Sequence, residues 1–154
     1  MSRQREGDGS PAPDKPWCVF VAGSRDLTWE PHYVLVKERL RHFMGQHSVL
    51  IHGAGPGRKE GVPGCDAIAD RIGNELGFSV YAFPALWKLQ GGAAGPIRNR
   101  LCIDVWLAFQ RAGYRLVMLG FSTGGVGTEG AMEIARHMSR DLTVVNIERI
   151  TVIL

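Results

Sequence analysis

The sequence Ser122-Thr123-Gly124-Gly125-Val126-Gly127-Thr128 lies where an apolar run, residues 116–121, is followed by a helical pattern that begins near Thr128. Glycines at such a junction allow the backbone to adopt positive φ and to approach a ligand closely. The first turn of the following helix offers unpaired N–H groups and a partial positive charge. The combination is typical of phosphate-binding glycine loops, and a plain tight turn between a strand and a helix is the alternative interpretation.

Two other predicted strands also run into glycine. Residues 19–22 precede Gly23-Ser24-Arg25-Asp26, and residues 49–51 precede His52-Gly53-Ala54-Gly55-Pro56-Gly57. In an open parallel sheet the carboxyl ends of the strands face one crevice, and ligands bind there where the strand order reverses. We therefore expect the three glycine-bearing strand ends to form a single nucleotide-type site. Three unrelated turns are the alternative.

Strand and helix patterns alternate along the whole chain. Short apolar runs predict strands, and apolar residues at helical spacing predict helices between them. The expected strands are residues 17–22, 48–52, 78–83, 114–121 and a fifth within 142–154, and the expected helices are residues 30–44, 66–76, 97–113 and 128–138. Residues 85–96 are expected to form a loop over the edge of the pocket. This alternation predicts an α/β fold, a single Rossmann-like doubly wound domain with a mainly parallel sheet of about five strands and helices on both faces.

The composition fits one globular domain. The chain has 154 residues, of which 45% are hydrophobic and 21% are charged, which is enough to bury a core. We assign residues 16–154 to this domain. Residues 1–15 are polar and rich in Gly, Pro and charge, so we expect a disordered leader there. Because no segment resembles a signal peptide or a membrane-spanning helix, we expect no membrane partner.

Charge and cysteine usage restrict the partners. The net charge is +3, and Lys and Arg are scattered, so nucleic acid is unsupported as a main partner and an anionic small molecule explains the balance equally well. Cys18, Cys65 and Cys102 form neither a metal-ligand spacing nor a disulfide framework. We therefore expect no metal site, and we expect no cofactor. We also expect a cytoplasmic location, because the cytosol keeps thiols reduced. A homo-oligomer stays open.

Several short runs follow one another in a recognisable order over residues 19–145. They are Gly23-Ser24-Arg25-Asp26, His52-Gly53, Gly64-Cys65-Asp66 with Ala69, Phe83-Pro84-Ala85 with Trp87, Ala93-Ala94-Gly95-Pro96-Ile97-Arg98-Asn99, and Gly124-Gly125-Val126-Gly127-Thr128. In this order they resemble the YspA-like branch of the SLOG superfamily, and Gly-Pro-Ile-Arg-Asn is the most specific part. The resemblance implies a Rossmann-like fold. It also implies kinship with nucleotide-ligand sensors, DNA-uptake proteins and the LOG phosphoribohydrolases, which cleave the N-glycosidic bond of nucleoside 5′-monophosphates.

The chain departs from the LOG signature Pro-Gly-Gly-x-Gly-Thr-x-x-Glu at two positions. Thr123 replaces the proline, and Ala131 stands where the resemblance places the catalytic glutamate. Glu129 and Glu133 are two residues away on the predicted helix, which turns their side chains by about 200°. Neither is therefore a direct substitute. The resemblance makes Arg98 the candidate for the arginine that pairs with that glutamate, and residues 56–63 are an extension of a loop that is usually shorter.

These observations favour a binding protein over an enzyme. The expected function is binding of a phosphorylated nucleoside or ADP-ribose-like ligand at the carboxyl ends of the strands, as a sensor or ligand-sequestering module. The alternative is a nucleoside 5′-monophosphate N-glycosidase, a LOG-like phosphoribohydrolase. The candidate ligand-binding residues are Gly23, Ser24, Arg25, Gly53, Asp66, Arg98, Asn99, Gly124, Gly125, Gly127 and Thr128. The candidate catalytic carboxylates are Asp26, Asp66 and Glu129.

Three residues keep two interpretations each. Asp66 either caps its helix or contacts a ribose, since Asp is common in both roles. His52 is either a hydrogen-bonded structural imidazole, the favoured reading for a single histidine, or an acid or base. Trp87 either stacks on a base or anchors the loop to the core.

Overall fold

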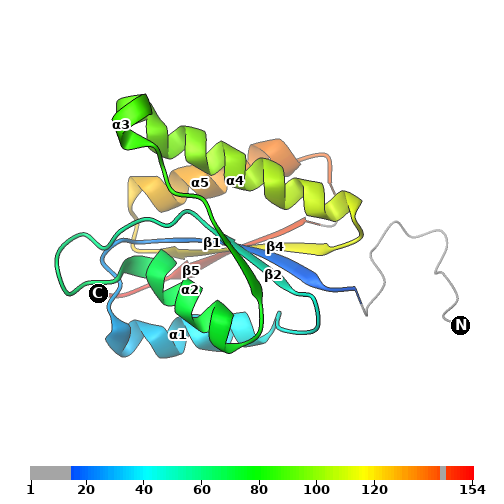
Figure 1. Ribbon diagram of the computed structural model, residues 1–154, viewed down its shortest axis with the longest axis horizontal. Helices are drawn as coiled ribbons and strands as arrows, with labels where there is room; N and C mark the ends of the chain where they lie inside the picture. The colour runs from blue at the N-terminus through cyan, green and yellow to red at the C-terminus, as the bar shows by residue number, and fades with distance from the viewer. Residues whose placement is uncertain (1–14, 143–144) are drawn as a thin grey trace, which may run out of the picture.

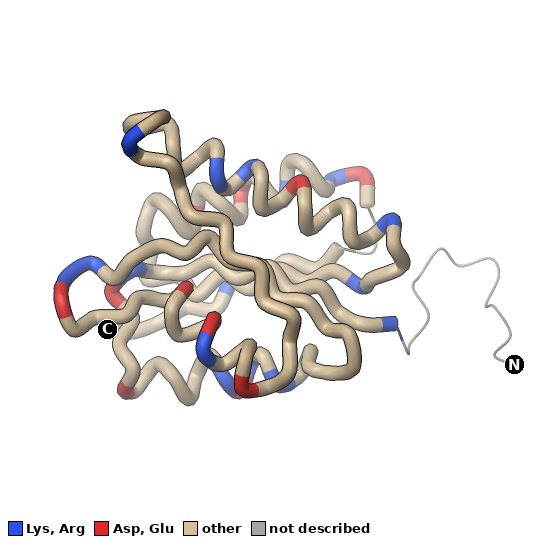
Figure 2. Tube along the Cα trace, viewed as in Figure 1, with Lys and Arg blue, Asp and Glu red and all other residues tan. Residues whose placement is uncertain are grey.

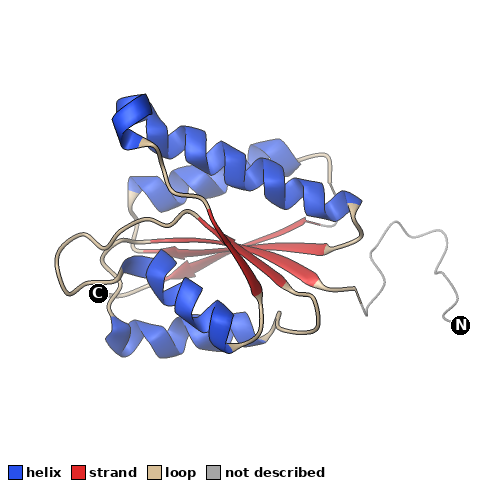
Figure 3. Cartoon of the chain, in the orientation of Figure 1, coloured by secondary structure: helices blue, strands red, loops and turns tan. Residues whose placement is uncertain are grey.

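Five runs rich in β-branched and aromatic residues form one sheet in the computed structural model, which describes residues 15–142 and 145–154. The strands are β1 (Trp17–Gly23), β2 (Val49–His52), β3 (Ser79–Ala82), β4 (Arg115–Ser122) and β5 (Val145–Thr151). Every pairing is parallel, and the strands lie in the order β3-β2-β1-β4-β5 (Figure 3). The chain therefore moves outward from β1 to β3 and then returns to the other side of β1. This reversal places a crevice at the carboxyl ends of β1 and β4.

Helices cover both faces of the sheet (Figure 1). Helices α1 (Trp29–Arg41) and α2 (Gly64–Glu75) lie on one face, and α4 (Ala94–Arg111) and α5 (Val126–Ser139) lie on the other. The central strand supplies both cores through its period of two. Val19 and Val21 pack under α1 and α2, whereas Cys18 and Phe20 pack under α4 and α5. The predicted single Rossmann-like α/β domain is confirmed.

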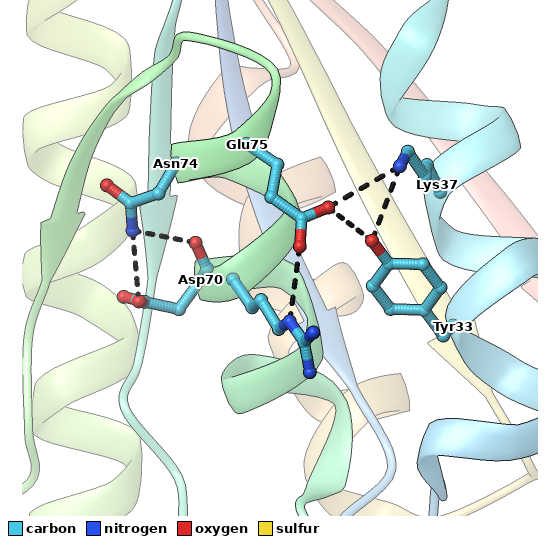
Figure 4. Close-up of polar contacts among 6 residues, drawn as sticks. Tyr33, Lys37, Asp70, Asn74 and Glu75 are labelled. Atoms are coloured by element: carbon cyan, nitrogen blue, oxygen red, sulfur yellow. Dashed lines mark hydrogen bonds and ion pairs between the residues drawn. The ribbon is translucent and has the colours of Figure 1, made fainter.

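A polar network ties α2 to α1 on the outer surface of their face (Figure 4). The Glu75 carboxylate accepts hydrogen bonds from the Tyr33 hydroxyl, from Lys37 Nζ at 3.4 Å and from Arg71 Nε at 3.1 Å. These contacts fix the later turns of α2 against α1.

The structure corrects the expectation for residues 85–96. Instead of a continuous loop, it has a one-turn helix α3 (Trp87–Gln90) followed by a 3₁₀ turn (Gly91–Ala93). One turn is too short for apolar periodicity to reveal, and Gly91 and Gly92 directly after it conceal it further. Helix α4 begins at Ala94, so Pro96 lies in its first turn, where a proline loses no hydrogen bond.

The other element bounds differ from the predicted bounds by three residues or fewer, as helix and strand ends commonly do. Residues 1–14 of the predicted disordered leader, and residues 143–144 before β5, lie outside the described residues. Within the described ranges, every helix is too short or too polar to span a lipid bilayer.

Candidate functional site

A cavity of about 380 Å³ lies at the carboxyl ends of β1, β2 and β4. At this end of the sheet the starts of α4 and α5 come from one face, and the loop from β2 to α2 comes from the other (Figure 1). The structure brings every predicted ligand-binding residue to its wall. These residues are Gly23, Ser24, Arg25, Gly53, Asp66, Arg98, Asn99, Gly124, Gly125, Gly127 and Thr128.

The glycine loop after β4 presents an open helix end to this cavity. Gly124 has a φ of +89°, which glycine adopts without strain, and its N–H donates to Ser122 Oγ at 3.0 Å. Helix α5 follows with no side chain capping it. Its first residues, Val126, Gly127 and Thr128, line the cavity. The Thr128 side chain is more than nine-tenths buried, and we find no hydrogen bond of its hydroxyl to the described residues.

Arg98 is the fifth residue of α4, close to the amino end of the helix, where the helix dipole disfavours a cation. Its Nε donates to Asn99 Oδ1 at 2.8 Å, and its Nη1 donates to the carbonyl oxygen of Gly53. Within residues 15–142 and 145–154, we find no carboxylate in salt-bridge contact with this guanidinium. The cavity thus contains a positive charge that is held in place by neutral oxygens.

Asp66 lies in the first turn of α2 and lines the same cavity. Its Oδ2 accepts a hydrogen bond from the Gly55 N–H at 2.7 Å, and it makes no capping bond to α2. Burial raises the pKa of the Asp66 carboxyl group, and the Gly55 N–H, His52 and Arg98 oppose this rise. Of the two interpretations of Asp66, the helix cap is not observed.

The loop between β2 and α2 is fastened to the end of β1. Arg25 Nε donates to the carbonyl oxygen of Pro56 at 2.8 Å, and Arg25 Nη2 donates to that of Gly57 at 3.4 Å. Arg58 Nε contacts Asp26 Oδ1 at 2.7 Å. Arg25 thus lines the cavity but directs its guanidinium to the loop. Arg58 also lines the cavity and was missed from the sequence, although its place after a strand end in this sheet was a usable signal.

His52 is a structural imidazole. Its side chain is buried, its Nδ1 accepts the Ala54 N–H at 2.9 Å, and its Nε2 lies 2.7 Å from Asp70 Oδ2. Since Nδ1 accepts, Nε2 carries the proton and donates to Asp70. Asn74 holds the other oxygen of Asp70 at 3.2 Å (Figure 4). Both ring nitrogens are therefore occupied.

Trp87 fits neither of its two interpretations. Its side chain is 55% exposed, so it does not anchor the core, and it is absent from the wall of the cavity. Instead its ring lies against Gly95 at the start of α4, where a Cβ would come within 3.2 Å of Trp87 Cη2.

The three candidate carboxylates separate into two groups. Asp26 and Asp66 line the cavity, whereas Glu129 does not. Glu129 Oε1 instead accepts hydrogen bonds from Ser122 Oγ at 2.6 Å and from Arg149 Nε at 2.7 Å. The Ser122 hydroxyl and then the Arg149 guanidinium hold the pKa of Glu129 below its ordinary value. Ala131, which the sequence resemblance aligns with the LOG glutamate, lines the cavity.

The cysteines are buried and unpaired, and burial raises the pKa of Cys102 to about 12. A thiol with so high a pKa is a poor nucleophile at neutral pH. Among the residues that the structure describes, we find no cluster of His, Cys, Asp or Glu that could hold a metal ion.

Comparison of the chain with family models, curated proteins and solved structures gives no match.

Proposed function

We propose that this chain binds a phosphorylated nucleoside or an ADP-ribose-like ligand at the carboxyl ends of β1, β2 and β4, as a sensor or ligand-sequestering module. One observation carries the proposal: the uncapped start of α5 and the Arg98 guanidinium line the same cavity, without a carboxylate in contact with Arg98 in the described residues. A helix amino end and a guanidinium are both typical phosphate ligands. The hydroxyl of Thr128, a residue of the cavity wall, adds a further donor.

The remaining wall supports a sugar next to the phosphate. Asp66 and Asp26 line the cavity, and carboxylate oxygens commonly accept hydrogen bonds from ribose hydroxyls. The volume of about 380 Å³ falls in the range of roughly 300–1,000 Å³ that small-molecule sites occupy. Lys and Arg are spread over helices and loops around the chain, which favours a small anion over nucleic acid (Figure 2).

We extend the proposal to family and location. The motifs that resemble the YspA-like branch of the SLOG superfamily supply the glycines and Arg98 of this cavity, which supports membership in that branch. Three free, buried cysteines support a reducing compartment such as the cytoplasm. A homo-oligomer stays open.

The second candidate function is a nucleoside 5′-monophosphate N-glycosidase. Asp66 favours it, because burial raises the pKa of a carboxyl group that lines the cavity, and such a group suits general acid catalysis. Ala131 weighs against it, since the wall has no carboxylate at the position of the LOG glutamate.

A thermal unfolding panel tests the binding proposal. AMP, ADP, ADP-ribose and cyclic AMP are each added at millimolar concentration, with adenosine as the control that lacks phosphate. A ligand at a hundred times its Kd stabilises the native state by about 2.7 kcal/mol, which raises Tm by several degrees in a domain of this size. The proposal fails if no phosphorylated compound raises Tm, or if adenosine raises it as much as AMP does.

A further inference from the structure

Besides Arg98, the cavity wall has another cationic side chain, Arg58, that the proposed phosphate site does not use. Arg58 lies in the loop between β2 and α2 and lines the same cavity as Arg98. Its Nε contacts Asp26 Oδ1 at 2.7 Å, and this is the one side-chain partner that we find for it in the described residues. Its side chain is 59% exposed. The two Nη groups of the guanidinium are thus available to a ligand.

The backbone of this loop holds Arg58 in place. The Arg58 N–H donates to the carbonyl oxygen of Arg25 at 3.0 Å, and the Gly64 N–H donates to that of Leu27 at 3.0 Å. A Cβ on Gly57 would come within 2.6 Å of the Val62 carbonyl carbon, so the two sides of the loop are in close contact. A side chain on a fixed backbone loses less entropy when it binds a ligand.

The ion pair between Arg58 and Asp26 is easily exchanged. The Arg58 side chain is 59% exposed and the Asp26 side chain is 35% exposed, and ion pairs that solvent reaches in this way contribute about 0–1 kcal/mol to stability. A phosphate offers the guanidinium two parallel, charge-assisted hydrogen bonds instead. A ligand phosphate near Arg58 therefore competes well with Asp26.

Arg58 and the proposed phosphate site approach the cavity from different sides. Arg58 belongs to the loop that leads into α2, whereas Arg98 and the glycine loop stand at the starts of α4 and α5 on the other face of the sheet (Figure 1). One phosphate group at the start of α5 leaves Arg58 for a second anionic group.

The charge of the wall favours such a ligand. The wall has three arginines, Arg25, Arg58 and Arg98, against two carboxylates, Asp26 and Asp66, which leaves one positive charge in excess when both acids are ionised. The amino end of α5 adds about half a charge more.

We infer that Arg58 is a specificity-determining residue that selects a nucleoside diphosphate, with its second phosphate bound in place of Asp26, over a nucleoside monophosphate. This inference rests on the proposed function, in which the start of α5 and Arg98 bind one phosphate. It assigns the extended loop, residues 56–63, to ligand selection.

Calorimetric titration of the full chain with AMP and with ADP tests the inference. The wild type is expected to bind ADP more tightly than AMP. Arg58→Gln is expected to lower the affinity for ADP by about 10- to 100-fold, the equivalent of a lost charged hydrogen bond, and to change the affinity for AMP by less than about twofold. Lys59→Gln is the matched control, because Lys59 is exposed, carries the same charge and lies outside the wall.

Two more variants separate ligand contact from loop anchoring. Arg58→Lys keeps the charge and is expected to retain part of the preference for ADP. Asp26→Asn removes the competing carboxylate and is expected to increase the preference for ADP over AMP. If Arg58 only anchors the loop, Arg58→Gln and Asp26→Asn lower both affinities alike, which overturns the inference.

The outcomes distinguish the two proposals. A wild type that binds AMP, with an ADP affinity independent of Arg58, overturns the assignment of Arg58 and leaves the proposed function in place. A wild type that binds neither nucleotide overturns the proposed function, and the inference with it.

Discussion

Arg98 and Gly53 are in direct contact: the Arg98 guanidinium donates through Nη1 to the carbonyl oxygen of Gly53. A Cβ at position 53 would lie 2.6 Å from Arg98 Cζ, so glycine is what permits this approach. The contact joins the start of α4 to the end of β2, across 45 positions of sequence. The orientation of the cationic group in the cavity thus depends on a residue without a side chain.

Arg98→Ala should weaken binding of a phosphorylated ligand by about 1.5–3 kcal/mol, the range for hydrogen bonds to charged groups, while the fold is retained. Arg98→Lys should recover only part of this loss, because an ammonium lacks the planar fork. Calorimetric titration measures the effect, and Arg100→Ala on the exposed side of α4 is the control. If Arg98→Ala unfolds the chain, Arg98 has a structural role and the assignment is wrong.

Gly53→Ala should weaken binding of the same phosphorylated ligand, because it displaces the Arg98 guanidinium from the end of β2. The new methyl group collides with the guanidinium, so the side chain has to leave its acceptor. Because both changes act on one contact, the double variant with Arg98→Ala should lose little more than Arg98→Ala alone. Gly130→Ala on α5 is the control, since its Cβ meets no atom within 4 Å. Full additivity in the double-mutant cycle contradicts this coupling.

The residues of the cavity wall could be predicted from the sequence, because the rule that places them holds for parallel sheets in general. Glycine-bearing ends of parallel strands converge at one edge, so Gly23, Gly53 and Gly124 were predicted to lie together, and they do. The same rule does not tell where a side chain points. Arg25 follows a strand end as expected, yet its guanidinium binds the loop carbonyls of Pro56 and Gly57.

Other features depend on contacts between residues that are distant in the chain. Arg58 follows a strand end, which signals the right edge of the sheet, but it reaches the cavity because its loop folds back to Arg25, and no local pattern encodes that return. Glu129 is at the predicted end of the sheet, but Arg149 on β5 and Ser122 draw its carboxylate away from the cavity. Residues 85–96 were expected to be a loop because a one-turn helix has no periodicity to detect.

Ser122→Ala should destabilise the chain and weaken ligand binding together. The buried Ser122 hydroxyl accepts the Gly124 N–H at 3.0 Å and donates to Glu129 at 2.6 Å, so its loss leaves the Gly124 N–H without this partner. The expected cost is about 1–3 kcal/mol in the free energy of unfolding. Chemical denaturation measures that free energy, and titration measures the affinity.

Ser139→Ala provides the matched control for Ser122→Ala. Ser139 is also a buried serine, but its hydroxyl donates to the Ala135 carbonyl within α5, far from the glycine loop in the chain. This variant should leave ligand affinity unchanged. Equal losses of affinity in the two variants would show that Ser122 does not act through the glycine loop.

Asp66→Asn should change the pH dependence of stability. Burial raises the pKa of Asp66 above its ordinary value of 3.8, so the native state binds this proton more tightly than the unfolded state does. The wild type therefore loses stability as the pH rises from 3.8 through the raised pKa, and the loss is complete above it. The neutral Asn side chain removes this loss. Relative to the wild type, the variant should gain stability over that window and keep the gain at higher pH.

Free energies of unfolding from about pH 3 to about pH 7, the region around ordinary carboxyl pKa values, measure this difference. Asp104→Asn on the exposed side of α4 is the control and should follow the wild type. A gain that appears only as the pH falls would mean that the Asp66 carboxylate stabilises the fold, which is the opposite sign.

Ala131 distinguishes a binding protein from a glycosidase. A glycosidase needs a carboxylate near the anomeric carbon, where it stabilises positive charge that develops only in the transition state. Ala131 lines the cavity, the proposed relationship aligns it with the LOG glutamate, and its methyl group supplies no charge. Purified protein incubated for hours with nucleoside monophosphates should therefore release no free base, and chromatography of the mixture measures this.

Ala131→Glu should introduce slow hydrolysis, because Arg98 and the glycine loop already hold the phosphate. The opposite outcome is base release by the unmodified chain that Asp66→Asn or Asp26→Asn abolishes and Glu129→Gln does not. It would show that a carboxylate on the opposite wall carries out the hydrolysis, and that the chain is an enzyme.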